Sequence, residues 1–201
     1  IIMAENKPQE IRKQEIMDAA MQLFVKKGYS ETSMSDIMNK TGLSKGAIYH
    51  HFENKKTLFI SLIDHWQQNI FPDFHQYENP EATASDTLLK FSEEVATTFK
   101  KNPAVFLAEL EFWSMANRDE EVRDMVKTMY GSILELFEKV IIMGIKSSEF
   151  KQLDPKVSAL SVMTALQGII WFTLFESDSF RGEEYLKSVL DFIIFGFKKS
   201  R

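Results

Sequence analysis

The sequence contains no cysteine, which excludes structural disulfides and metal sites built from thiolates. Eight glycines and five prolines among 201 residues leave few positions where a helix must break. No segment alternates polar and apolar residues for long enough to predict a sheet. The sequence also lacks an apolar run of about 18 residues, so no membrane-spanning helix is predicted. The charged N-terminal region is unlike a secretory signal, so we expect a cytoplasmic protein.

Motifs that bring catalytic or cofactor chemistry are also missing. The sequence has neither a G-x-S-x-G nucleophile motif nor a G-x-x-x-x-G-K-[ST] phosphate-binding loop. His50 and His51 are adjacent and point about 100° apart on a helix, so they cannot share a metal ion. Glu109 and Glu111 are two residues apart and face different directions, so they do not form a carboxylate pair. We therefore expect no enzyme, no cofactor and no metal site.

Charge is distributed unevenly along the chain, whose net charge is −5. Residues 1–60 hold nine Lys and Arg against seven Asp and Glu, a net charge of +2, so the remaining residues carry −7. The overall acidity argues against non-specific binding to polyanions. It does not exclude a small DNA-binding surface, because the local field steers phosphate contacts.

The spacing of apolar residues predicts an all-α chain of about nine helices. In the first helix Ile16, Ala20 and Phe24 fall on one stripe, and Gly28 ends it. Thr32 or Ser33 can cap the next short helix, and Ser44 can cap the one after it. The expected helices cover 9–27, 33–40, 44–52, a longer helix that begins at Asn54, and then 84–101, 104–116, 119–147, 154–177 and 183–199.

Residues 33–52 have the spacing of a helix-turn-helix motif. Thr41-Gly42-Leu43 separates the two short helices, and the glycine permits the sharp turn. Apolar side chains such as Ile48 can lock the helices together. The small residues Gly46 and Ala47 let the start of the second helix approach a major groove closely.

Residues 9–60 resemble the TetR family of bacterial transcriptional regulators, most specifically in the run Gly42-Leu43-Ser44-Lys45-Gly46-Ala47-Ile48-Tyr49-His50-His51-Phe52. The resemblance implies a DNA-binding domain over 9–60, a recognition helix at about 44–51, and a helical effector-binding and dimerisation domain over 61–201. Many relatives carry a hydroxyl residue at the position of Ala47, so contact there is limited to apolar groups such as a thymine methyl. The DNA-binding residues implied by the resemblance are Ser33, Ser35, Ser44, Lys45, Gly46, Ala47, Tyr49, His50, His51 and Lys55.

Large apolar side chains are concentrated in the C-terminal part of the chain. Core packing is the commoner role of such residues, but 17 Phe and ten Met favour an adaptable apolar cavity if one exists. We expect a mostly hydrophobic effector, with a polar or positive end if Glu109 or Glu111 takes part. The candidate ligand-binding residues are Trp66, Phe99, Phe106, Trp113 and Trp171.

Residues 157–175 and 185–197 are apolar around the whole helix. Such helices must be covered on more than one side, and a monomer of this size cannot easily bury two of them. We therefore expect a homodimer formed through these two segments, which also resembles the usual dimer of the family. Its paired recognition helices would bind palindromic half-sites on double-stranded DNA.

The sequence therefore predicts a DNA-binding transcriptional regulator, in particular a repressor released from its operator by a small hydrophobic ligand. The ligand would shift the helix that follows the recognition helix and change the separation of the two half-site contacts. An alternative is a regulator whose C-terminal domain responds to a partner protein. An exposed apolar groove outside the dimer contact would support that alternative, and a large internal cavity would argue against it.

Overall fold

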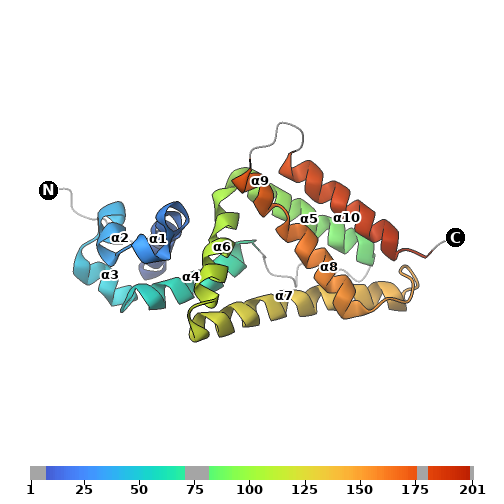
Figure 1. Ribbon diagram of the computed structural model, residues 1–201, viewed down its shortest axis with the longest axis horizontal. Coiled ribbons are helices and arrows are strands. Elements are labelled where there is room, and N and C mark those ends of the chain that lie inside the picture. The colour runs from blue at the N-terminus through green and yellow to red at the C-terminus, as the bar shows by residue number, and fades with distance from the viewer. Residues whose placement is uncertain (1–7, 71–81, 176–180, 200–201) are drawn as a thin grey trace.

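The computed structural model describes residues 8–70, 82–175 and 181–199, which form helices α1 to α10 (Figure 1). The all-α prediction is confirmed: the described residues form no strand, and Phe150 and Lys198 form only an isolated bridge. The helices are α1 Gln9–Glu31, α2 Met34–Thr41, α3 Lys45–His51, α4 Lys55–Ile70, α5 Ala84–Lys101, α6 Ala104–Ala116, α7 Glu120–Lys146, α8 Pro155–Gln167, α9 Ile170–Leu174 and α10 Gly182–Phe197.

Capping side chains explain most of the helix boundaries. At α2 the Ser33 hydroxyl accepts a hydrogen bond from the Asp36 amide at 3.1 Å, and the Asp36 carboxylate accepts one from the Ser33 amide at 2.7 Å. This reciprocal arrangement is a capping box, and Thr83 and Asp86 repeat it at α5. Asp119 caps α7 in a simpler way. Because these caps are local, the observed boundaries lie close to those expected from the sequence.

Two expected helices differ from the structure. The helical conformation of α1 stops at Gly28 as expected, since its φ of 83° and ψ of 156° are not helical, but helix resumes beyond it as far as Glu31. The helix expected over 154–177 is divided, since α8 ends before Gly168 and α9 begins two residues later. A Cβ atom at Gly168 would lie 2.1 Å from the hydroxyl oxygen of Tyr185, so the α10 side chain occupies the space beside this break.

Helices α1 to α3 form a small group at one end of the molecule, and α4 leads from it into a larger bundle (Figure 1). Helix α7 packs against α4, α5, α6 and α8, while α10 packs against α5 and α8. The two groups share one core. The ring centroids of Phe24 on α1 and Phe59 on α4 are 5.5 Å apart, and those of Phe59 and Phe112 on α6 are 5.6 Å apart. Packed side chains therefore join helices α1 to α3, which we call the helix-turn-helix group, to the bundle.

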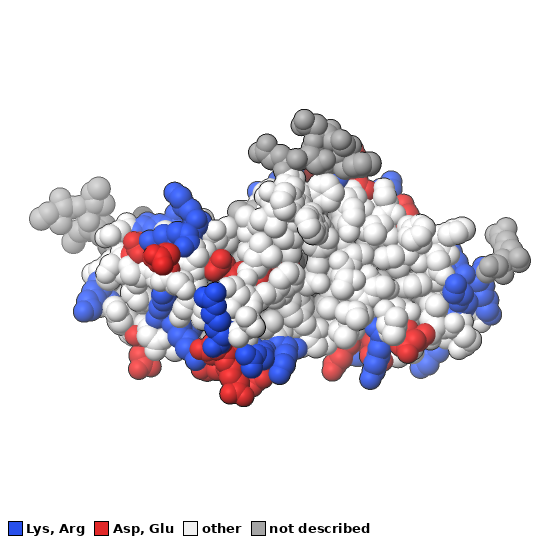
Figure 2. Space-filling view, viewed as in Figure 1, with Lys and Arg blue, Asp and Glu red and all other residues white. Residues whose placement is uncertain are grey.

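Helices α8 and α10 are not covered on all sides. Each buries one face, with Val162 and Leu190 among the buried residues. The opposite faces carry large apolar side chains that are open to solvent: Val157 is 64% exposed, Phe192 76% and Phe195 80%. Figure 2 shows a largely uncharged surface over α8 and α10. The pattern interpreted as apolar all round thus combines a core face with an exposed face.

One segment has the composition of a membrane span. Within the described residues, Pro155–Leu174 is long and apolar enough to cross a membrane by length and composition alone, which the expectation of no long apolar run did not anticipate. The break at Gly168 and the packing of α8 against α7 and α10 place the segment in the bundle instead.

Candidate functional site

Helices α2 and α3 are held together by a short turn and a buried contact. Gly42 adopts a φ of 69°, and its amide donates to the Met38 carbonyl at 2.9 Å to close α2. The Ser44 hydroxyl accepts a hydrogen bond from the Ala47 amide at 3.3 Å and so begins α3. Ile37 and Ile48 are fully buried on the inner sides of the two helices. The outer side of α3 is therefore presented in a fixed orientation.

The outer side of α3 is accessible. Lys45, Gly46, Tyr49 and His50 are exposed, and no atom lies within 4 Å of the position where a Cβ would stand on Gly46. The Lys45 ammonium lies 5.6 Å from the centroid of the Tyr49 ring. A helix with an open, small residue between a cation and a phenol has the shape and donors to enter a major groove.

The two histidines of α3 differ in environment. His50 is exposed, and the Gln9 amide donates to its Nε2 at 3.1 Å. His51 and Ala47 are half-buried. Burial, followed by the electrostatic effect of the neighbouring His50 imidazole, lowers the pKa of His51, so the neutral form of His51 is favoured.

The two serines expected at the DNA backbone also differ. The Ser33 hydroxyl donates to Asp36 Oδ2 at 2.6 Å in addition to capping α2, so its hydrogen-bonding capacity is used within the chain. Hydrogen bonds from Ser33 and Lys27 hold the pKa of the Asp36 carboxyl well below its usual range. Ser35 is exposed, so of the two serines it is the better placed to reach a phosphate.

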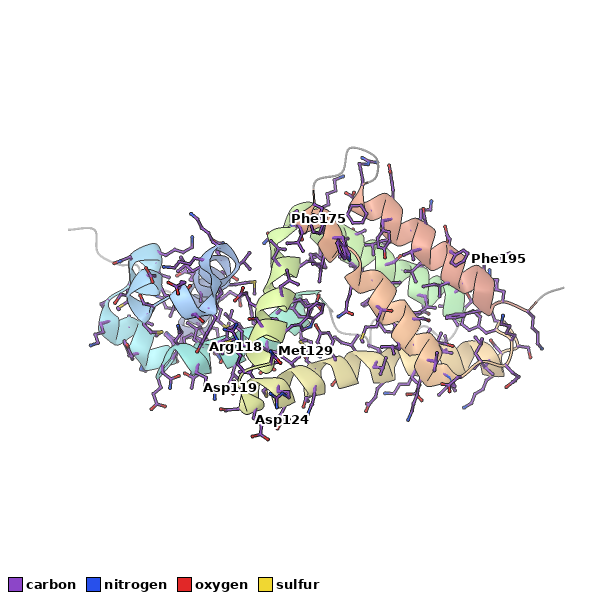
Figure 3. All side chains as sticks on the ribbon, viewed as in Figure 1. Arg118, Asp119, Asp124, Met129, Phe175 and Phe195 are labelled. Atoms are coloured by element: carbon purple, nitrogen blue, oxygen red, sulfur yellow. The ribbon has the colours of Figure 1, made fainter. Side chains whose placement is uncertain are left out.

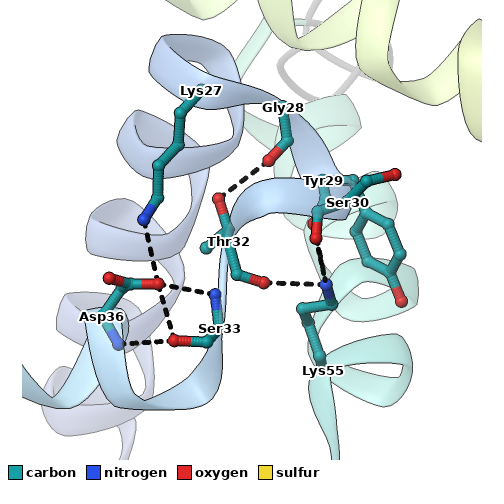
Figure 4. Close-up of polar contacts among 8 residues, drawn as sticks. All are labelled: Lys27, Gly28, Tyr29, Ser30, Thr32, Ser33, Asp36 and Lys55. Atoms are coloured by element: carbon teal, nitrogen blue, oxygen red, sulfur yellow. Dashed lines mark hydrogen bonds and ion pairs between the residues drawn. The ribbon is translucent and has the colours of Figure 1, made fainter.

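Lys55 is engaged by the chain itself (Figure 4). Its Nζ donates to the carbonyls of Tyr29 and Thr32, both at 2.7 Å, and lies 4.2 Å from the Tyr29 ring centroid. Burial lowers the pKa of this ammonium. In this conformation Lys55 ties the start of α4 to the end of α1. A DNA contact at this position stays a prediction.

The helix-turn-helix group is also tied to the larger bundle by polar contacts. Lys56 Nζ lies 2.8 Å from Asp119 Oδ2 and 2.8 Å from Glu121 Oε2. Figure 3 shows Asp119 where α6 gives way to α7. The Tyr29 amide donates to Glu111 Oε2 at 3.0 Å. Movements of α6 and α7 therefore reach both α4 and the end of α1.

A small closed cavity lies inside the larger bundle, among α4, α5, α6, α7 and α8. Its volume is about 20 Å³, which is room for little more than one water molecule. The wall is apolar apart from Glu109, Tyr130 and Gln167. The Glu109 Oε1 atom accepts hydrogen bonds from the Tyr130 hydroxyl and, at 2.8 Å, from Gln167 Nε2. Burial raises the pKa of the Glu109 carboxyl.

A larger open hollow of about 260 Å³ lies on the surface between α6, α8 and α9. Trp113 and Trp171 line it, and Trp171 stacks on Phe175 with ring centroids 5.0 Å apart. Trp113 Nε1 donates to the Tyr130 hydroxyl at 2.7 Å, and Gln167 lines both this hollow and the closed cavity. One hydrogen-bonded network, from Trp113 through Tyr130 and Glu109 to Gln167, therefore links the linings of the two spaces.

The structure divides the five expected ligand-binding residues. Trp66 and Phe106 line the closed cavity, and Trp66 Nε1 donates to the Val105 carbonyl at 2.9 Å. Trp113 and Trp171 line the surface hollow instead, because apolar spacing does not distinguish a core face from an exposed one. Phe99 lies in neither wall and packs against Phe106, with ring centroids 5.7 Å apart.

The sequence analysis missed Tyr130 and Gln167. Both residues become part of the site only when α6, α7 and α8 pack together, so no local motif marks them. The signal that could have drawn attention to this region is Glu109, an acidic residue within the apolar segment of α6.

Comparison with known proteins accounts for both groups of helices. Residues 16–62 match the family described as bacterial regulatory proteins, tetR family, and residues 84–194 match the family described as BetI-type transcriptional repressor, C-terminal. The fatty acid metabolism regulator protein of Bacillus subtilis is 22% identical over 184 residues, which cover 90% of this chain and 93% of that protein.

Two solved structures share the whole fold. A putative transcriptional regulator from Saccharomonospora viridis, in complex with choline, has a TM-score of 0.81 and 20% identity, covering 96% of this chain and 100% of its own. FadR from Bacillus subtilis, in complex with stearoyl-CoA, has a TM-score of 0.78 and 21% identity, covering 92% of this chain and 98% of its own. At these identities the two structures support the fold alone.

Proposed function

Because the chain belongs to the TetR family of DNA-binding transcriptional regulators, we propose that it is a repressor that a small, mostly hydrophobic ligand releases from its operator. The observation that carries this proposal is the connection between the closed cavity and the helix-turn-helix group. Trp66 stands in the cavity wall on α4, the helix that begins just after α3. A ligand that displaces Trp66 would act on the element that positions the recognition helix.

Aromatic contacts extend from Trp66 toward α1. The centroids of Trp66 and Phe112 are 5.7 Å apart, and those of Phe112 and Phe59 are 5.6 Å apart; Phe59 then meets Phe24. Close-packed rings of this kind transmit displacement because the interior has little free volume. Any ligand larger than a few atoms must expand the cavity of about 20 Å³, so binding favours a different packing of α4.

The complexes of the similar proteins support a small-molecule ligand of some kind. One of them holds choline and the other stearoyl-CoA, two ligands that differ greatly in size. Proteins of this fold therefore bind small molecules of very different size, and the identity of the ligand has to come from the residues of each protein.

We further propose that two copies pair through the exposed apolar faces of α8 and α10. Figure 3 shows Phe195 on α10 and Phe175 at the end of α9, each on the outer surface of the bundle. Pairing would remove these side chains from water, and neighbouring exposed apolar side chains often mark a protein interface. The two α3 helices would then bind half-sites about 34–36 Å apart or a multiple of that distance.

The proposal is tested with an operator recovered by selection from genomic fragments. Binding of the full-length protein is measured against salt concentration, and a panel of uncharged and charged lipophilic compounds is then titrated into the complex. We expect binding that weakens steeply with salt, and release by at least one compound. Absence of salt-dependent DNA binding would contradict a DNA-binding repressor. Intact DNA binding with no response to any compound would favour a partner protein as the signal.

A further inference from the structure

A carboxylate is buried in the wall of the closed cavity with no positive charge beside it. Glu109 is 3% exposed, and no lysine, arginine or histidine of the described chain forms an ion pair with it. Its hydrogen-bond donors are the neutral groups of Tyr130 and Gln167. Neutral donors offset only part of the hydration that a carboxylate loses on burial. The site therefore gains most from a ligand that supplies the missing charge.

The rest of the wall suits an organic cation. The rings of Trp66, Phe106 and Tyr130 line the same cavity, and aromatic faces attract ammonium groups. A metal ion would need several oxygen or nitrogen ligands, whereas the described residues contain no group of three acidic or histidine side chains that could hold one. One carboxylate among aromatic rings fits a diffuse positive charge on an apolar body.

We infer that the effector is an organic cation, a substituted ammonium group on an apolar body, and that Glu109 binds its positive end. This inference rests on the proposed function, since it assigns the ligand of the same cavity. The geometry also selects against acids: an anionic ligand would meet Glu109 at short range with no cation in the wall to compensate.

Gln167 gives the cation a route to Glu109. It lines both the closed cavity and the surface hollow, and its amide donates to Glu109 at 2.8 Å. A cation that reaches Glu109 can replace this hydrogen bond, and rotation of the Gln167 side chain then joins the two spaces. The positive end would lie at Glu109, while the apolar body would extend into the hollow of about 260 Å³ against Trp113 and Trp171.

The test uses two probes of the same shape that differ in charge. Benzyltrimethylammonium carries the cation, and in neopentylbenzene a carbon atom replaces the nitrogen. Affinity of the full-length protein for each probe is measured by tryptophan fluorescence and calorimetry. We expect the cation to bind at least about tenfold more tightly, because its charge pairs with a carboxylate in a site with little water.

Glu109→Gln tests the assignment to this residue. The glutamine keeps the size of the side chain and an oxygen that accepts from Tyr130 and Gln167, but it removes the charge. The preference for benzyltrimethylammonium over neopentylbenzene should fall most of the way to onefold, because the charged contact is lost and only the attraction of the aromatic rings to the cation remains. Glu135→Gln is the matched control, because Glu135 is an exposed carboxylate on α7 and its loss should leave the preference unchanged.

Gln167→Ala tests the route. Removing the Gln167 amide takes away the group that competes with the cation for Glu109. It also removes the side chain that lies between the closed cavity and the surface hollow, so the association rate constant of benzyltrimethylammonium should rise. An unchanged rate constant would overturn the route through Gln167.

Equal binding of the two probes, or a preference that survives in Glu109→Gln, would overturn the inference, as would failure of both probes to bind. The proposed function is decided by a separate readout. If neopentylbenzene or another uncharged lipophile binds and lowers operator affinity, the chain is a ligand-responsive repressor whose effector is not a cation.

Discussion

Lys45 and Lys55 illustrate two roles that a lysine can have near a DNA-binding surface. Lys45 is exposed on α3, whereas Lys55 donates to the carbonyls of Tyr29 and Thr32. Lys55→Ala should lower the free energy of unfolding by about 1–2 kcal/mol, because carbonyls at the end of α1 lose a charged donor. Lys45→Ala should change it by less than about 0.5 kcal/mol.

Salt titrations complete this comparison. Lys45→Ala should reduce the slope of log affinity against log salt concentration by about one, which corresponds to one lost phosphate contact. Urea denaturation of both variants supplies the stability values. If Lys55→Ala is fully stable but shows the reduced salt slope, the result would instead support the phosphate contact that the family resemblance implies for Lys55.

The buried carboxyl of Glu109 predicts a pH-dependent stability. Burial raises its pKa above the ordinary value of 4.5 in the folded protein. A group with a raised folded-state pKa contributes stability that is present below 4.5 and is lost as the pH rises through the folded-state pKa. At pH 7–8 the Glu109→Gln variant should therefore have a Tm higher by about 2–4 °C, which corresponds to about 1 kcal/mol.

The pH profile of the Tm difference is the decisive measurement. The gain of Glu109→Gln should shrink as the pH falls below 4.5, where the wild-type carboxyl is largely protonated in both the folded and the unfolded state. A lower Tm for Glu109→Gln at neutral pH would mean that the buried charge stabilises the fold.

Individual residues show what the sequence could and could not predict. The run from Gly42 to Phe52 predicts the turn and the start of α3 because its caps, turn glycine and spacing are all local features. The contacts of Lys55 with α1 and of Glu109 with α7 and α8 depend on elements that are distant in sequence. No local pattern specifies them, so the roles of these two residues emerge only from the fold.

At the scale of the helix, the capping box of α2 makes a prediction that separates stability from DNA binding. Ser33→Ala removes the cap of α2 and should lower the free energy of unfolding by about 1 kcal/mol. Ser35→Ala, two residues further on, changes an exposed side chain and should be nearly neutral for stability. Thermal denaturation of both variants tests the difference.

DNA binding should rank these two variants in a different way. If Ser35 reaches a phosphate, Ser35→Ala weakens operator binding while its Tm stays unchanged. Equal losses of stability in the two variants would show that the Ser33 cap has no special role in α2.

Helix boundaries followed from the sequence wherever a cap or a glycine acts locally. The division between α8 and α9 did not, because the conformation at Gly168 accompanies the approach of Tyr185 from α10. The exposed apolar faces of α8 and α10 agree with the expectation that a single copy cannot cover these helices on all sides. Apolar spacing reports that a face avoids water, but it cannot tell whether its own chain or a second copy provides the cover.

At the scale of the whole molecule, two features matter: the helix-turn-helix group is packed firmly against the bundle, and α8 and α10 leave apolar side chains exposed to water. Aromatic contacts and the Lys56–Asp119 ion pair connect the helix-turn-helix group to the bundle, so the orientation of α3 follows the packing of α4, α6 and α7. A single copy presents one recognition helix. Simultaneous contact with two half-sites requires a second copy, whose spacing is set by the face through which the copies pair.

The pairing face can be tested with substitutions that leave the monomer intact. Phe192 and Phe195 are 76% and 80% exposed, so Phe192→Glu and Phe195→Glu should change the stability of the isolated chain by no more than about 0.5 kcal/mol. In a symmetric dimer each substitution would bury an unpaired charge twice, and sedimentation should show monomers. Ala165→Glu is a poorer choice because Ala165 is half-buried against the core of its own chain.

Met143→Glu is the matched control, since Met143 is a partly exposed apolar residue on α7 and so lies outside the two helices of the proposed interface, and its substitution should leave the dimer unchanged. Operator binding supplies a second readout. The monomeric variants should lose affinity for a two-half-site operator far more than for an isolated half-site, because the second contact is no longer held at a high effective concentration. Dimers that persist in both Phe192→Glu and Phe195→Glu would place the contact on another face, and the exposed side chains of α10 would then need a different partner.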